Sequence, residues 1–207
     1  MAVAVDQTPG RRRRSEQKRA RILDAAEELF VSAGYEQATV DGVAARAQVS
    51  KRTIYDHFGD KATLFAAVLE RARLAVTWTI RKAIDEELLE GRETRAALIA
   101  FAERISLRAF PSPAYFTFRR LLAQPSAPRP APREYEEPER MLADRLARFA
   151  AAGKLSCPQP RIAAAHFAAL TVRLVLDAHA CDPAGVPESA MHRIVEDGVD
   201  AFLRAYR

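Results

Sequence analysis

The sequence has little of what membrane-bound, secreted and metal-binding proteins display. It holds two cysteines, Cys157 and Cys181, with no further ligand at metal-binding spacing, so we expect two reduced thiols rather than a disulfide or a zinc site. No apolar run reaches the roughly 18–20 residues that a membrane span needs. The arginines Arg11–Arg14 stand where a secretory signal would begin its hydrophobic segment. These absences predict a cytoplasmic protein that has no membrane partner.

Arrangements typical of an active site are also missing. The four histidines, His57, His166, His179 and His192, are dispersed, and no carboxylate pair or Ser-His-Asp set can be assembled around them. His166 and His179 offer metal-ligand chemistry together with Cys181, but their spacing of 13 residues does not make them neighbours on a helix. We expect no catalytic residue, no metal and no cofactor. An enzyme with a helical fold is therefore the weakest hypothesis.

What the sequence does have is helical periodicity along most of its length. Ile22, Ala26 and Phe30 recur at four-residue spacing until Gly34 stops the pattern, and no segment favours a strand. Prolines between residues 125 and 132 mark a loop, because proline removes a backbone donor and restricts its neighbour. We predict an all-α fold. Its helices cover residues 15–33, 40–47, 51–58, 61–89, 93–109, 115–123, 134–152, 160–180 and 187–206.

Two short helices in the first third of the chain have the spacing of a helix-turn-helix. Thr39 opens the first helix as its N-cap, Gln48 and Val49 form a tight turn, and Ser50 caps the second. Asp60 is the predicted cap of the helix that follows. The spacing alone is weak evidence, since many helical bundles contain such a pair without binding DNA.

The side chains of the second short helix favour DNA binding. Ile54 and Phe58 turn to the core at i and i+4, which leaves hydrogen-bond donors and one aromatic ring on the opposite face: Lys51, Arg52, Thr53, Tyr55 and His57. A helix of two turns fits the major groove, where phosphate contacts position a protein and base contacts specify sequence. The net charge of +5 and the pI of about 9.5 suit a polyanionic partner.

The run TVDGVAARAQVSKRTIYDHFGDKATLFAAVL, which begins at Thr39, resembles the DNA-binding head of the TetR family of regulators. The preceding ILDAAEELFVSAGYEQA resembles the first helix of that family, so the match spans about residues 16–70. The resemblance implies a three-helix helix-turn-helix head followed by a C-terminal helical bundle for effector binding and dimerisation. We accordingly predict a flexible basic arm at 1–14, a DNA-binding domain at 15–61, and a ligand-binding and dimerisation domain at 62–207.

The same resemblance implies roles for individual residues of the head. It implies contacts to DNA phosphates from Thr39, Ser50 and Lys61, and contacts to the sugar-phosphate backbone from Tyr55 and His57. The positions that face the bases are occupied by three further residues, which we expect to read sequence: Lys51, Arg52 and Thr53. For Arg11–Arg14 two interpretations stay open, a solubilising tail and an arm that enters the minor groove.

Two positions depart from what the helix-turn-helix favours. Gln48 stands where the family usually has glycine, so a positive φ angle there would cost about a kilocalorie per mole. Gly42 lies inside the first of the two short helices, where glycine costs roughly 1 kcal/mol relative to alanine. We expect the turn geometry, and not the family assignment, to be affected.

The C-terminal part is predicted to pair with a second copy of the chain. The helix at 160–180 is rich in alanine (Ala163, Ala164, Ala165, Ala168 and Ala169), followed by the apolar Leu170, Val172, Leu174, Val175 and Leu176. The last helix carries an apolar stripe at helical spacing: Met191, Ile194, Val195, Val199, Phe202 and Leu203. The resemblance implies that two such helices from each copy form a four-helix dimer interface. The alternative is that both are ordinary core helices.

An effector pocket would lie in the middle of the chain if the resemblance extends there. The candidate lining residues are the aromatic side chains of that region: Trp78, Phe101, Phe110, Tyr115 and Phe118. Aromatic residues at helical spacing are more often core than ligand site. The functional hypothesis is a homodimeric, sequence-specific transcriptional regulator, a repressor that a small-molecule effector releases from a palindromic DNA operator. The alternative of a different class is a helical protein-interaction module that has lost DNA binding.

Overall fold

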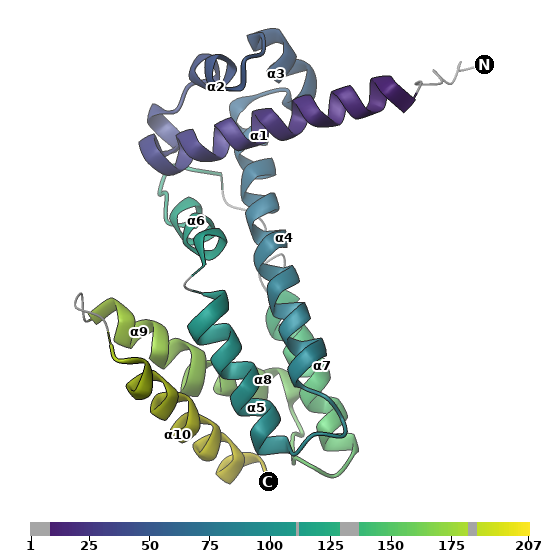
Figure 1. Ribbon diagram of the computed structural model, residues 1–207, viewed down its shortest axis with the longest axis vertical. Helices are drawn as coiled ribbons and strands as arrows, with labels where there is room; N and C mark the ends of the chain where they lie inside the picture. The colour runs from purple at the N-terminus through teal and green to yellow at the C-terminus, as the bar shows by residue number, and fades with distance from the viewer. Residues whose placement is uncertain (1–8, 111, 129–136, 182–185) are drawn as a thin grey trace. The chain divides into compact units, whose positions relative to one another are not determined.

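The computed structural model describes residues 9–110, 112–128, 137–181 and 186–207, and within these ranges it contains helices and no strand (Figure 1). The all-α fold predicted from the sequence is confirmed. The α-helices are α1 (Pro9–Gln37), α2 (Val40–Ala47), α3 (Lys51–Phe58), α4 (Lys61–Glu87), α5 (Thr94–Glu103), α6 (Pro113–Leu122), α7 (Glu137–Ala151), α8 (Pro160–Ala168), α9 (Leu174–Cys181) and α10 (Glu188–Tyr206). Two π-helical segments, η1 (Arg104–Ala109) and η3 (Ala169–Arg173), continue α5 and α8.

Capping residues fix the ends of the short N-terminal helices. The hydroxyl of Thr39 accepts a hydrogen bond from the backbone N–H of Gly42 at 3.0 Å, and that of Ser50 accepts one from Thr53 at 3.1 Å. A carboxylate oxygen of Asp60 caps α4 in the same way. All three caps were predicted and are confirmed. Each depends on a side chain within three residues of the N–H group that it satisfies.

The start of α1 differs from the prediction. We expected a flexible arm over residues 1–14 and a helix from Ser15, whereas α1 begins at Pro9. Proline is tolerated in the first turn of a helix, because the N–H that it lacks has no partner there, and arginine is a good helix former. Residues 9–14 are therefore helical. Residues 1–8 of the predicted arm lie outside the described residues.

Two segments predicted as regular α-helix are π-helical. They are η1 and η3, which contact each other, and η3 also packs against α10. At that contact a Cβ atom on Gly198 would overlap the backbone carbonyl of Leu170, so only glycine allows this approach. The π-helical turns of η1 and η3 occur where helices distant in sequence contact one another. Such contacts cannot be predicted from sequence periodicity.

The chain divides into two compact units. The first contains the described residues of 1–73 together with those of 117–130, and the second contains 74–116 and the described residues of 131–207. The helices α4 and α6 therefore each contribute residues to both units. This division differs from the predicted boundary between residues 61 and 62, and the assignment of 117–130 to the first unit has no counterpart in the prediction.

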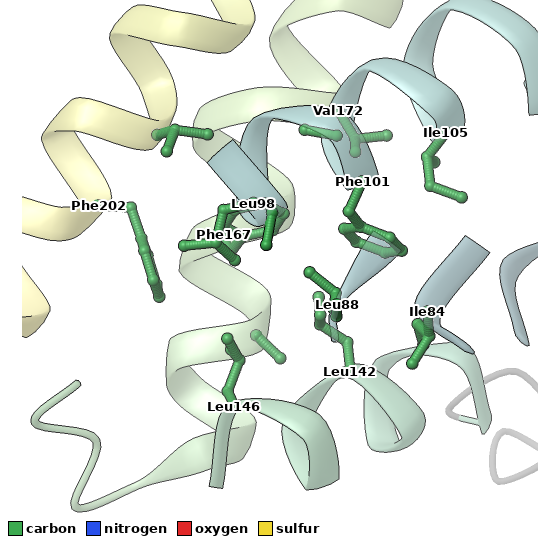
Figure 2. Close-up of a cluster of buried hydrophobic side chains, with 14 of the residues drawn as sticks. Ile84, Leu88, Leu98, Phe101, Ile105, Leu142, Leu146, Phe167, Val172 and Phe202 are labelled. Carbon is green, nitrogen blue, oxygen red and sulfur yellow. The ribbon is translucent and has the colours of Figure 1, made fainter. Parts of the chain in front are cut away.

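Each unit has its own apolar core. In the first, Phe65 makes edge contacts with Phe30 and Tyr35, each with ring centroids 5.1 Å apart, and Leu121 of α6 is buried in the same cluster. In the second, side chains from α4, α5, α7, α8, α10 and both π-helical segments belong to one buried cluster, and Figure 2 shows Phe101 and Phe167 near its centre. The other labelled residues are Ile84, Leu88, Leu98, Ile105, Leu142, Leu146, Val172 and Phe202.

Candidate nucleic-acid interface

The turn between α2 and α3 is held in a left-handed conformation. Gln48 has φ 53° and ψ 49°, and within the described part of the chain it alone among non-glycine residues has a positive φ. The N–H groups of Gln48 and Val49 donate to the carbonyls of Ala45 and Ala44. A guanidinium nitrogen of Arg21 donates to the carbonyl of Ala47 at 2.6 Å. This bond from α1 ties down the C-terminal turn of α2, next to the strained residue.

Gly42 has a packing role that explains its place inside a helix. A Cβ atom there would lie 3.2 Å from a methyl carbon of Leu29 on α1 and 3.2 Å from the capping hydroxyl oxygen of Thr39. The glycine therefore lets α2 pack closely against α1 while it leaves the cap undisturbed. The close packing of α2 against α1 compensates for the helix propensity that glycine lacks relative to alanine.

The helix α3 presents the polar face that the sequence predicted. Ile54 and Phe58 are buried in the core of the first unit. The Tyr55 side chain is 43% exposed, which is unusual for a large ring and leaves it open to contact. Lys51, Arg52 and Asp56 are exposed, whereas Thr53 and His57 are half-buried. The acidic Asp56 thus lies among the exposed residues of α3.

The capping hydroxyls of Thr39 and Ser50 differ in whether their hydrogen is free to be donated. In each cap the hydroxyl oxygen accepts a backbone N–H, so the O–H of Thr39 remains available to a phosphate oxygen. Ser50 differs because its hydroxyl is also 2.8 Å from that of Thr53. These two hydroxyls share one hydrogen bond, so only one of the pair has a hydrogen for an outside acceptor.

Lys61 is held in place by the end of α1. Its ammonium donates to the carbonyl of Glu36 at 3.1 Å and lies 4.5 Å above the ring of Tyr35. Two of the three ammonium hydrogens remain for other acceptors. Tyr35 is itself anchored, because its N–H donates to the side chain of Gln124 at 2.6 Å. Sequence reasoning missed Gln124, which lies 89 residues from Tyr35 and belongs to no motif.

Lys51 has an acidic partner within the protein. Its ammonium lies 3.0 Å from a carboxylate oxygen of Asp41 in the first turn of α2, and the two side chains are 50% and 70% exposed. The hydrogen bond to Asp41 raises the pKa of Lys51. Sequence reasoning missed this pair, because the partners are ten positions apart with the turn between them, which gives no helical adjacency.

The exposed cations near the start of α1 differ in their contacts from Arg19, which lies further along the helix. Arg13, Arg14 and Lys18 are exposed and contact no acidic side chain of the described residues. Arg19 instead stacks 5.2 Å above the ring of Phe58. Arg13, Arg14 and Lys18 therefore form no ion pair among the side chains that the structure describes.

The five predicted effector-pocket aromatics have different surroundings. Trp78 is 62% exposed, with the ammonium of Lys82 5.2 Å from its ring, whereas Phe101 is buried in the core of the second unit. Phe110 and Tyr115 stack on each other with centroids 4.3 Å apart. Phe118 packs against the core of the first unit. Their role as ligand contacts stays a prediction.

A cavity of about 150 Å³ lies between α4 and α7 in the second unit. None of the predicted aromatics lines it. Arg145 lines this cavity. Its guanidinium donates to the carbonyl of Leu88 at 2.8 Å and to a carboxylate oxygen of Asp85 at 3.1 Å. The lining residues are Arg81, Ile84, Asp85, Met141, Asp144, Arg145 and Arg148.

Most residues of the predicted dimer surface are buried within the protomer. Among these are Ala163, Val195 and Val199. The exposed apolar positions on the same helices are fewer, and those along α8, η3 and α9 are Ile162, Ala165, Ala169 and Leu174. Cys157 is buried as a free thiol, and burial raises its pKa. His179 and Cys181 fall outside the residues whose side chains are described.

Among the described helices, none combines the length and the apolar composition that a membrane span requires.

A donor-rich two-turn helix, set against a second short helix by a tight turn, defines a helix-turn-helix protein of the DNA-binding class. Comparison with known proteins places it more narrowly. The signature of "Bacterial regulatory proteins, tetR family" matches residues 22–68, and that of "AefR-like transcriptional repressor, C-terminal domain" matches residues 96–207. Since the second signature alone covers more than half of the chain, the protein belongs to the TetR family.

Individual relatives agree with this assignment. A segment of 96 residues, 46% of this chain, is 38% identical to the HTH-type transcriptional activator FasR of Mycolicibacterium smegmatis and covers 44% of it. A segment of 76 residues, 37% of this chain, is 37% identical to the HTH-type transcriptional repressor SCO4008 of Streptomyces coelicolor and covers 38% of it. The chain thus matches less than half the length of either curated relative. Both are regulators, so the family gives no support to the helical-enzyme hypothesis.

Solved structures extend the likeness over nearly the whole chain. A TetR-family regulator from Mesorhizobium loti is 24% identical with a TM-score of 0.77, over 93% of this chain and 98% of that one. The Flavonoid-responsive Regulator FrrA is 27% identical with a TM-score of 0.69, over the same shares. The fold prediction, a helix-turn-helix head with a C-terminal helical region, is confirmed.

Proposed function

We propose that this protein is a sequence-specific transcriptional repressor that binds a palindromic DNA operator as a homodimer. The observation that carries the proposal is the face of α3, where exposed Arg52 and Tyr55 stand opposite the buried Ile54 and Phe58. Lys61 and the capping hydroxyl of Thr39 flank this face with further donors. The repressor assignment is supported by the description of the C-terminal signature. Such a protein acts in the cytoplasm, where its operator lies.

The competing assignment is an activator. It is favoured by the segment that is 38% identical to FasR, a protein named as an activator. A reporter gene placed behind the operator separates the two: repression predicts higher expression when the chain is deleted, and activation predicts lower expression.

The contact assignments are tested by substitution and binding. We expect Tyr55→Ala and Lys61→Ala to weaken binding to every duplex, since both residues are assigned to the DNA backbone. Lys61→Ala should also reduce the slope of log affinity against log salt by about one unit. Arg52→Ala should instead change which sequences are preferred. Fluorescence anisotropy with the operator and with an unrelated duplex measures all three.

A matched control is Lys82→Ala, which removes the same charge from the exposed side of α4 beside Trp78. It should leave affinity and salt slope unchanged. If Tyr55→Ala, Lys61→Ala and Arg52→Ala all bind as the unsubstituted protein does, the contact assignment is wrong. If the unsubstituted protein shows no salt-sensitive affinity for any duplex, the DNA-binding function itself fails.

We further propose that the effector is a mostly apolar, uncharged molecule with a hydrogen-bonding group. The core of the second unit consists of apolar side chains, yet it encloses the hydroxyls of Thr77 and Ser106, for which no partner is found in the described residues. A buried hydroxyl without a hydrogen-bond partner destabilises the folded protein, and a ligand group that bonds to it would recover that stability. The cavity of about 150 Å³ is smaller than the roughly 300 Å³ at which ligand pockets usually start. Neither hydroxyl lines this cavity and both are buried, so a ligand would reach them only if the core opened.

The family relative FrrA is named for its response to flavonoids, so flavonoids form a rational first panel. Calorimetry with this panel should find a compound that binds and that weakens operator affinity. Ser106→Ala should lower the affinity for that compound and leave operator binding unchanged in its absence. Because α4 contributes residues to both units, a ligand that displaces its second half has a continuous helix through which to act on the head.

A further inference from the structure

We propose that Asp41 competes with DNA phosphates for the ammonium of Lys51. By holding Lys51 away from DNA, Asp41 acts as a specificity-determining residue of the helix-turn-helix. This inference rests on the proposed DNA-binding function. It concerns an acidic side chain of α2 to which no role has been assigned. Its effect should be largest on duplexes that lack the operator sequence, because their binding depends mainly on phosphate contacts.

Local electrostatics favour the paired arrangement. Asp41 lies in the first turn of α2, where the helix dipole stabilises an anion. Lys51 is the first residue of α3, where the same effect disfavours a cation unless an anion is close. The carboxylate of Asp41, at 3.0 Å from the Lys51 ammonium, supplies that anion.

The carboxylate stands where a phosphate would otherwise be attracted. Lysine ammonium groups bind phosphate oxygens, and here an internal anion already pairs with the ammonium of Lys51. A DNA phosphate can bind the Lys51 ammonium only after the duplex has displaced the Asp41 carboxylate. The bound duplex then lies next to a carboxylate that has lost its partner. Both consequences weaken binding to duplexes of any sequence.

Two other cations that are assigned to DNA contacts, Lys61 and Arg52, lack an acidic partner of this kind among the described residues. Lys61 is held by a carbonyl and a ring, neither of which neutralises its charge, and Arg52 has no acidic partner in the described part of the chain. These two therefore remain available to DNA while Lys51 is engaged. The sequence-based expectation that Lys51 reads bases is replaced by a role in which Asp41 controls it.

The test measures affinity for an unrelated duplex and for the operator across a range of salt concentrations. An exposed ion pair is weak, so we expect Asp41→Asn to tighten binding to the unrelated duplex by about two- to fivefold at low salt. The salt slope should steepen by about 0.9, the value for one further phosphate neutralised. Operator affinity should rise less, so the ratio of specific to nonspecific affinity should fall.

The decisive comparison uses Lys51→Gln. Alone it should change the affinity for the unrelated duplex little, and in combination it should abolish the gain from Asp41→Asn. Equal gains with and without Lys51 would mean that Asp41 acts only through its charge, and the pairing proposal would be overturned. It would also be overturned if Asp41→Asn had no effect, or if Lys51→Gln alone flattened the slope by one unit.

Glu28→Gln provides a matched control, because it removes one negative charge from the same unit and breaks the exposed pair of Glu28 with Arg46 on α2. It should leave the salt slope unchanged. Failure of the unsubstituted protein to bind any duplex would reject the proposed function and is distinct from these outcomes. Both Asp41 and Lys51 are exposed, so the variants should retain the unfolding temperature of the unsubstituted protein.

Discussion

At the scale of single residues, the head shows which features depend on sequence neighbours and which on distant partners. The caps at Thr39, Ser50 and Asp60 were predictable, because each side chain bonds a backbone group within its own turn. The pairing of Lys51 with Asp41 was not, since it requires the packing of α2 against α3. The capping residues were thus predictable from the sequence, while the ion pair of Lys51 was not, and the DNA contacts assigned to the site residues stay predictions.

Gln48 should be the place where the head is easiest to stabilise. Its left-handed conformation costs a residue with a side chain about 1 kcal/mol, and glycine adopts it freely. We expect Gln48→Gly to raise the free energy of unfolding by about 0.5–1 kcal/mol in urea denaturation. Gln48→Ala keeps the strain and should give no gain. A destabilised Gln48→Gly variant would show that the contact of this side chain with Arg21 matters more than the backbone strain.

His192 should make the stability of the second unit depend on pH. Its imidazole bonds Glu103 of α5 and lies near Glu188, and these contacts raise its pKa above 6.5. A raised pKa means that the stabilisation is complete below about pH 6.5 and is lost as the pH rises through the folded-state pKa. The unfolding temperature should therefore exceed that of His192→Gln at pH 6 by more than at pH 8.5. A difference that stays constant with pH would contradict this assignment.

At the scale of helices, periodicity predicted where most elements lie but not how they deviate from regular geometry. Pro160 begins α8, as the sequence indicated, and α10 begins at Glu188, one residue after the predicted start at Pro187. The π-helical segments η1 and η3 were not predicted, because they form where helices from distant parts of the chain touch. The early start of α1 was missed because a run of arginines was interpreted as an arm.

The contact between α10 and η3 should tolerate no side chain at Gly198. A Cβ atom there would collide with the backbone at Leu170, which cannot move without shifting the helix. We expect Gly198→Ala to destabilise the protein by about 2–4 kcal/mol in denaturant unfolding, as for an overpacked core. Gly91→Ala is the control, because a Cβ atom at Gly91 would meet nothing within 4 Å. Equal effects of the two substitutions would contradict the packing argument.

At the scale of the whole molecule, the proposed dimer depends on the apolar side chains that the protomer leaves exposed. Burial of Ala163, Val195 and Val199 within one chain means that the predicted surface is narrower than the sequence indicated. The remaining exposed positions follow one another at helical spacing along α8, η3 and α9: Ile162, Ala165, Ala169 and Leu174. Periodicity cannot distinguish a helix face that packs within its own chain from one that packs against a second copy.

A charge in this stripe should separate the protomers. We expect Ala165→Glu to convert a dimer into a monomer in light scattering and to reduce operator affinity at least tenfold, because one head reads only a half-site. Ala75→Glu, at an exposed position of α4, introduces the same side chain elsewhere and should leave the dimer intact. A dimer that persists with Ala165→Glu would place the interface on another surface.

The membership of the described residues 117–128 in the first unit has a consequence for how such proteins can evolve. Leu121 completes the core around Phe30 and Phe65, and Gln124 bonds the backbone of α1 at both Phe30 and Tyr35. A recombination event that exchanged only the N-terminal segment would give the new head a foreign Leu121 and Gln124. Acquisition of a new operator by head exchange would then need a second crossover downstream, which makes gradual substitution on α3 the more accessible route.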